Sequence, residues 1–279
     1  MSEVRKHYTS RFENGRILEL DFSQLEIYVL AFLSQDSQLI DDLLSGADLH
    51  GISAENLFGA MYTKAHRKIA KQLSFQLQYG AGAKSMAASN DILITTARKF
   101  IKNYYERYPQ VKAFQDRMIE EVEKLRETSE KRTKKGLPAG VAKWQSLSGR
   151  IYTFVEQDAP SFVDKEASFS PTQIKNYPTQ GFATGDIVPL VVGKLYRRLL
   201  DWSNEIADPV LMIGTVHDSV VFDCANKSVA KLWAKEAKKI MEMAPEYVRE
   251  VFGIEFNLPL RVEAEYGENW HDMVELDLT

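Results

Sequence analysis

The sequence has 279 residues, of which 44% are hydrophobic and 27% are charged. This composition is typical of a globular protein and excludes disordered, collagen-like and coiled-coil chains. Cys224 is the only cysteine, which excludes an internal disulfide framework and a cysteine-rich zinc site. No apolar stretch approaches the roughly 20 residues that a membrane span needs, and the first residues do not resemble a signal peptide. We therefore expect a soluble, cytoplasmic protein without membrane contact.

The net charge is −4, which by itself argues mildly against a nucleic-acid-binding protein. Two segments are nonetheless strongly basic. Residues 124–135 hold six basic and two acidic residues, and residues 64–71 hold four lysines and arginines and no acid. Because a run of charge is usually a solvated surface, neither segment alone identifies a partner.

The first predicted elements are a strand and two helices. Residues 16–22 (RILELDF) largely alternate between apolar and polar side chains and end in an acidic residue, which predicts a partly buried strand with Asp21 near its end. Residues 23–26 have the spacing of a helix capping box, so we expect a helix directly after this strand. Residues 64–79 predict a second helix, closed by Gly80.

The middle of the chain is predicted to be mostly helical. Residues 91–128 predict a long, charged helical segment that is broken near Pro109. Residues 129–145 predict a basic loop, and residues 182–202 predict a helix that Pro189 should kink or interrupt.

A hairpin and a helix are predicted near the end. Residues 210–216 and 220–224 are strand-like and flank the polar triplet at 217–219, which predicts a hairpin with this triplet at its tip. Residues 227–251 predict a closing helix. Because strands and helices do not alternate regularly, the sequence favours an α+β fold over a parallel, doubly wound sheet.

Asp21 and Asp218 both follow apolar strand-like segments. An unpaired buried charge costs several kcal/mol, and two carboxylates within about 4 Å repel by about 4 kcal/mol at an effective dielectric of 20. A hard divalent cation such as Mg²⁺ reverses that sign. The alternative is structural, with Asp21 as a strand-end turn residue and Asp218 as an acid at the hairpin tip.

Four side chains form a stripe on the helix predicted at 64–79. Arg67, Lys71, Phe75 and Tyr79 follow one another at intervals of four residues and share one helix face. Two cations followed by two aromatic rings suit a nucleoside triphosphate. The alternative is an amphipathic helix whose long basic side chains lie along the surface.

Five segments occur in the order and approximate spacing of the motifs of family A (polymerase I-like) DNA polymerases: DFSQLEIYVLAFLSQD, DLH, HRKIAKQLSFQLQYG, NYPTQG and TVHDSVVFD. The sequence resembles that family over roughly residues 9–272, and its motifs are most similar to those of bacteriophage members. The resemblance implies template-directed DNA synthesis by two-metal nucleotidyl transfer. It also implies two Mg²⁺ ions as cofactors, and primer-template DNA and dNTPs as partners.

The resemblance implies a role for each residue at a matching position. Asp21, Asp218 and the main-chain carbonyl of Phe22 would hold the metal ions. Lys71 would join the two aspartates in catalysis as the proton donor to pyrophosphate. The implied nucleotide-binding residues are Gln24, Glu26, His50, Arg67, Lys71, Phe75 and Tyr79, and the implied DNA-binding residues are Asn176, Gln180 and His217.

Glu26 matches the residue that crowds the sugar 2′ position and hydrogen-bonds the tyrosine matched here by Tyr79. Three other positions depart from the family pattern. Tyr28 stands where arginine is common, and Gln76 stands where many relatives have glycine. Ser219 stands where many relatives have a third carboxylate, so we expect the two aspartates to suffice.

The implied α+β fold is a partial palm, with an antiparallel sheet, and a mostly helical fingers subdomain. The palm would comprise residues 1–45 and 173–279, and the fingers residues 46–172. Because Asp21 lies so near the first residue, the thumb and the exonuclease are expected to be absent. The sequence is thus interpreted as the C-terminal part of a split or truncated polymerase that needs an N-terminal partner fragment. The alternatives are a non-catalytic nucleotide- or DNA-binding remnant and a two-metal nuclease.

Overall fold

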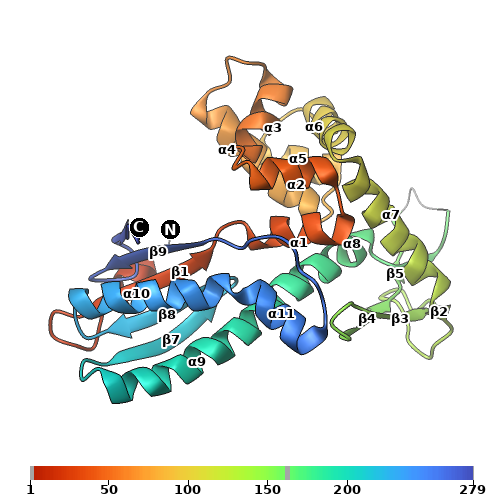
Figure 1. Cartoon of the computed structure of the whole chain (residues 1–279). Helices are drawn as coiled ribbons and strands as arrows, with labels where there is room; N and C mark the ends of the chain where they lie inside the picture. Colours follow the sequence, from red (N-terminus) through yellow and green to blue (C-terminus); the bar gives the residue numbers. More distant parts are fainter. Residues whose placement is uncertain (1–2, 161–163, 279) are drawn as a thin grey trace. The chain divides into compact units, whose positions relative to one another are not determined.

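The computed structural model describes residues 3–160 and 164–278 (Figure 1). Backbone contacts divide the chain into two compact units. The sheet unit contains the residues up to Glu26 and those from Phe182 onward, and the helical unit contains Ile27–Gly181. Since compact units need not coincide with functional subdomains, the predicted palm and fingers boundaries stay a prediction.

The sheet unit is built on a five-stranded antiparallel sheet with the order β10-β9-β1-β8-β7. Its central strand, β1, buries Leu18, Leu20 and Phe22 on one face and exposes Asp21 on the other. The strands are β1 (Arg16–Phe22), β7 (Val210–Val216), β8 (Ser219–Cys224), β9 (Val262–Gly267) and β10 (Met273–Glu275).

Helices cover the apolar face of this sheet. Helix α10 (Lys227–Glu242) packs on β1 and β9, and α9 (Val188–Glu205) contacts both α10 and β7 (Figure 1). The fully buried Trp233 of α10 meets the rings of Trp202 and Phe222, with ring centroids 5.2 and 5.5 Å away. The opposite face, which carries Asp21, is thereby left for polar side chains. The remaining helical elements of this unit are η1 (Glu3–His7), most of the π-helical η2 (Gly181–Ile187), and α11 (Ala244–Phe252).

The helical unit consists of consecutive helices, then short strands, and a last helix. Its helices are α1 (Leu25–Ser34), α2 (Ser37–Leu44), α3 (Leu49–Phe58), α4 (Lys64–Gln78), α5 (Ala83–Asn90), α6 (Ile94–Arg107), α7 (Pro109–Lys124) and α8 (Pro171–Gln180). Strands β2 (Arg126–Glu127), β3 (Val141–Gln145) and β4 (Ile151–Val155) form one antiparallel sheet, and β5 (Gln157–Asp158) pairs with β6 (Ala167–Ser168).

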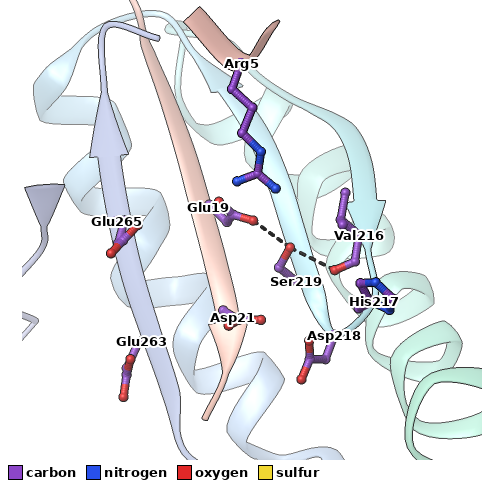
Figure 2. A pocket seen from close by; sticks show the side chains of 9 residues that line it. All are labelled: Arg5, Glu19, Asp21, Val216, His217, Asp218, Ser219, Glu263 and Glu265. Atoms are coloured by element: carbon purple, nitrogen blue, oxygen red, sulfur yellow. Dashed lines mark hydrogen bonds between the residues drawn. The ribbon is translucent and has the colours of Figure 1, made fainter. Parts of the chain in front are cut away.

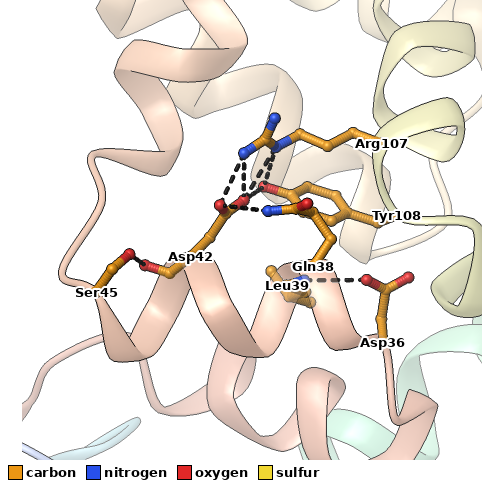
Figure 3. Close-up of polar contacts among 7 residues, drawn as sticks. All are labelled: Asp36, Gln38, Leu39, Asp42, Ser45, Arg107 and Tyr108. Atoms are coloured by element: carbon orange, nitrogen blue, oxygen red, sulfur yellow. Dashed lines mark hydrogen bonds and ion pairs between the residues drawn. The ribbon is translucent and has the colours of Figure 1, made fainter.

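A buried polar network ties α2 to the junction of α6 and α7 (Figure 3). The Asp42 carboxylate accepts two hydrogen bonds from Arg107 Nη2, at 2.7 and 2.8 Å, and one from Tyr108 Oη at 2.7 Å. Gln38 Nε2 donates a further bond at 2.9 Å. Such a network satisfies the buried carboxylate with several donors at once.

Several sequence-based predictions are confirmed. The fold is α+β, the strand at 16–22 is β1, and the helix at 64–79 is α4. The break at Pro109 is also present, because this proline begins α7. Within the described ranges, none of the helices combines the length and the apolar composition that spanning a bilayer requires.

Other predictions need correction. The predicted basic loop at 129–145 ends in strand β3, which pairs with β4 over five residues. The predicted helix at 227–251 is two helices, since Pro245 lies in the first turn of α11, where its missing amide is tolerated. By contrast, the interruption expected in the helix at 182–202 is present, because a π-helical segment precedes α9 and Pro189 lies in the first turn of α9. The hairpin tip has two residues, not three, because Ser219 belongs to β8.

Candidate active site

The sheet unit brings Asp21 and Asp218 together. Asp21 on β1 pairs with Ser219 on β8, and the Phe22 amide donates to the Asp218 carbonyl oxygen at 3.4 Å. The two aspartates line a pocket of about 300 Å³ (Figure 2). The pocket is also lined by Arg5, Glu19, Val216, His217, Ser219, Glu263 and Glu265.

A tight turn presents Asp218 at the rim of this pocket. His217 has a φ of +55°, in the left-handed region that two-residue hairpin loops use. Strand β8 is buried along its whole length and anchors the turn from behind. The side chains of His217 and Asp218 therefore project from a well-supported loop.

The two aspartates repel each other. Partial burial and then the Asp218 carboxylate raise the pKa of Asp21 to about 7, with smaller contributions from Glu19 and Glu263. Burial also raises the pKa of Asp218. A proton or a metal cation between the two carboxylates would relieve this repulsion.

These residues fit a hard divalent cation in part. Two carboxylates supply the oxygen ligands that Mg²⁺ prefers. Among the described residues, no cluster of three or more His, Cys, Asp or Glu side chains has metal-binding geometry. The remaining ligands would thus come from a main-chain carbonyl such as that of Phe22, from water or from substrate oxygens.

Three carboxylates of the pocket were missed by the sequence reasoning. Glu19 lies two residues before Asp21 and so shares its face of β1, and Glu263 and Glu265 project from the same face of β9. Strand alternation in RILELDF and VEAEYG was the available signal. Which acids face one another across strands, however, depends on a register that the sequence alone does not show.

The helical unit carries the predicted cationic and aromatic stripe on α4. The Thr63 side chain accepts from the His66 amide, and the His66 ring accepts from the Thr63 amide, which fixes the helix start. Arg67 and Lys71 are exposed, whereas Phe75 is half-buried. The stripe therefore runs from the surface into the unit.

Arg67 is already paired within this unit. Its Nε and Nη2 atoms donate to the two Asp48 carboxylate oxygens at 2.7 and 2.8 Å. This fork holds the pKa of Asp48 below its usual value. Asp48, which precedes His50 by two residues, was not singled out from the sequence.

His50 lies close to the stripe. Its ring centroid is 5.8 Å from that of Phe75, and burial, then the charges of Lys71 and Arg67, lower its pKa. Its Nδ1 atom is buried and has no hydrogen-bond partner among the described residues. A neutral imidazole with an unused nitrogen is thus held beside two cations.

The other predicted residues lie in both units. Asn176 donates to Gln180 at 3.0 Å along one face of α8, directly before the π-helical turn. Gln24 is exposed with a φ of +61°, and Glu26 is half-buried in the first turn of α1. The predicted hydrogen bond between Glu26 and Tyr79 stays a prediction.

The fold and the pair of Asp21 and Asp218 define the class of protein to which this chain belongs. An antiparallel sheet with paired aspartates on its polar face, together with a mainly helical unit, is the architecture of a polymerase palm and fingers domain. The model of the DNA polymerase family A matches residues 1–272. The chain therefore belongs to DNA polymerase family A.

Relatives in this family are similar along nearly the whole chain. The DNA polymerase I of Helicobacter pylori (strain ATCC 700392 / 26695) is 27% identical over 97% of this chain and 26% of its own length. The DNA polymerase of Bacillus phage SP01 is 30% identical over 98% of this chain and 28% of its own length. The thermostable DNA polymerase I of Thermus aquaticus is 30% identical over 92% of this chain and 27% of its own length. The chain thus spans about a quarter of the length of these relatives.

A solved structure has the same fold. The POL domain of Pol1 from M. smegmatis, in complex with DNA primer-template and dNTP, aligns with a TM-score of 0.70 at 20% sequence identity. The alignment covers 96% of this chain and 42% of that chain.

Proposed function

We propose that this chain carries the catalytic centre for template-directed DNA synthesis by two-metal nucleotidyl transfer. The observation that carries the proposal is the close pair of Asp21 and Asp218 on the polar face of an antiparallel sheet, in a member of DNA polymerase family A. Their mutual repulsion favours cation binding at this place. When bound, Mg²⁺ would supply charge stabilisation for an in-line phosphoryl displacement.

The chain's own residues would divide the work. Asp21, Asp218 and the Phe22 carbonyl would hold the metal ions, while His217 would contact the primer terminus. Arg67, Lys71 and the neutral His50 would bind the triphosphate oxygens, and Lys71 would give a proton to the leaving pyrophosphate. Gln24, Glu26, Phe75 and Tyr79 would surround the sugar and base, and Asn176 and Gln180 would contact template and primer.

We further propose that the chain works with an N-terminal fragment supplying the remaining palm and the thumb. Strand β7 is an edge of the five-stranded sheet, and its residues Ile213, Gly214 and Thr215 are exposed. An exposed edge with an apolar side chain is suited to pairing with another chain. The resemblance to bacteriophage motifs makes a phage-encoded split gene the proposed origin.

Reconstitution tests this function. The chain should extend a primer only weakly by itself, and co-expression with an upstream family A fragment should raise primer extension with dNTPs and Mg²⁺. A chain that binds labelled dNTP or DNA but gives no extension in any such pair would instead favour a non-catalytic remnant. Cleavage of labelled DNA without dNTP would favour a nuclease.

The sugar contact gives a separate prediction. Glu26→Ala should lower the discrimination between dATP and ATP, expressed as the ratio of kcat/KM values, by about 10- to 100-fold, because the side chain no longer fills the space beside the 2′ carbon. The measurement is single-nucleotide incorporation by the reconstituted enzyme. An unchanged ratio would remove Glu26 from the nucleotide-binding residues.

A further inference from the structure

Glu19 lies on the wall of the aspartate pocket (Figure 2), and its carboxylate accepts two hydrogen bonds. The Ser219 hydroxyl donates to its Oε1 atom at 2.7 Å, and the Trp270 indole N–H donates to its Oε2 atom at 2.8 Å. Each carboxylate oxygen thus has a fixed partner. Because Ser219 and Trp270 lie on segments far from β1 in sequence, the sheet unit has to fold before this carboxylate is oriented.

Ser219 connects Glu19 to the turn that presents Asp218. Its Oγ atom lies 3.1 Å from the Val216 carbonyl oxygen, so its proton is shared between Val216 and Glu19. Val216 and Ser219 are the residues on either side of the two-residue hairpin tip. The Glu19 carboxylate therefore braces the strand that carries Asp21 against the turn that carries Asp218.

The charge of Glu19 reaches both aspartates as well, since it contributes to the raised pKa of each. Glu19 does not form a direct metal-ligand set with the two aspartates, because the described residues contain no three-acid cluster with metal-binding geometry. Carboxylates that orient a metal site from outside its direct ligands act through hydrogen bonds and bound water. Glu19 has the position for that role.

We propose that Glu19 is a positioning residue of the metal site, which supplies from β1 the third carboxylate that Ser219 does not provide. It acts through Ser219 on the Asp218 turn and through the water molecules around the divalent cations. The inference rests on the proposed function, because it takes Asp21 and Asp218 as the metal ligands. It differs from the expectation that the two aspartates suffice, and the test below decides between them.

The test measures Mn²⁺ binding to the full chain by electron paramagnetic resonance, without DNA or nucleotide. Glu19→Gln keeps the size of the side chain and removes its charge, and should weaken Mn²⁺ affinity by about 10-fold or more. Ser219→Ala keeps the charge and removes the hydrogen bond, and should weaken affinity several-fold. The matched control is Glu265→Gln, which lies opposite Glu19 on β9, removes the same charge from the same pocket and should change affinity less than about 3-fold.

The outcomes test the positioning role of Glu19, its connection through Ser219 and the proposed metal ligands separately. Equal losses in Glu19→Gln and Glu265→Gln would show a general effect of charge and overturn the positioning role. Wild-type affinity in Ser219→Ala would overturn the connection through Ser219, and this variant decides alone if Glu19→Gln does not fold by circular dichroism. If Mn²⁺ still binds to both Asp21→Asn and Asp218→Asn, the proposed metal ligands are wrong. If both of these variants lose Mn²⁺ binding while Glu19→Gln binds Mn²⁺ with wild-type affinity, only the further inference is wrong.

Discussion

Asp21→Asn and Asp218→Asn should each lower the rate of primer extension by the reconstituted enzyme by about 10³-fold or more. A neutral amide keeps the shape of the side chain but removes the charge that would hold the cation. Loss of about 4 kcal/mol of transition-state stabilisation corresponds to a factor of 10³. The measurement is the single-turnover rate with saturating dNTP and Mg²⁺.

The control is Asp201→Asn, the same substitution at an exposed position of α9, which should extend primers at the wild-type rate. Equal activity in Asp21→Asn and Asp201→Asn would refute the assignment of Asp21. Activity in Asp218→Asn would likewise refute the assignment of Asp218.

The stability of the metal-free chain separates this loss of function from unfolding. The folded-state pKa of Asp21 is about 7, above the ordinary value of 3.8, so its ionisation destabilises the fold increasingly between those two pH values. In EDTA, Asp21→Asn should therefore be more stable than the wild type above about pH 7, by on the order of 1 kcal/mol once solvent screening is allowed for. At pH 4 the variant and the wild type should have the same melting temperature. If Asp21→Asn is inactive but more stable than the wild type, its loss of activity is not caused by unfolding.

Local sequence signals predicted most of the sheet unit's elements. The alternation of RILELDF placed Asp21 on the exposed face of β1, and the polar triplet between two apolar runs placed Asp218 at the hairpin tip. These signals work because strand periodicity and turn chemistry are local properties. The order of the family motifs then linked the two acids, although nearly two hundred residues separate them.

Long-range pairings could not be predicted in this way. The Trp270–Glu19 hydrogen bond joins residues 251 positions apart, and the Arg67–Asp48 fork depends on how α3 and α4 pack. Strand β3 was not predicted, because the strongly basic residues before it made residues 129–145 resemble a charged loop. Its side chains gain stability from pairing with β4, which a single segment does not reveal.

Asp42→Ala should lower the free energy of unfolding by about 3 kcal/mol. Asp42 is 8% exposed at its side chain and is the shared acceptor for Arg107 and Tyr108, and its removal leaves a cation and a phenol without their buried partner. Because the Arg107 side chain is 31% exposed and regains some hydration, the loss should lie at the lower end of the 3–5 kcal/mol typical of broken buried pairs. Urea denaturation of the full chain, followed by circular dichroism, measures it.

The matched control is Asp116→Ala, which breaks the Lys112–Asp116 pair on the surface of α7, where the two side chains are 55% and 47% exposed. An exposed pair four residues apart contributes about 0.5 kcal/mol or less, so this variant should unfold almost as the wild type does. The contrast isolates burial, because both variants remove one carboxylate from one ion pair. Similar free energies of unfolding for Asp42→Ala and Asp116→Ala would mean that the link between α2 and the α6–α7 junction contributes little to stability.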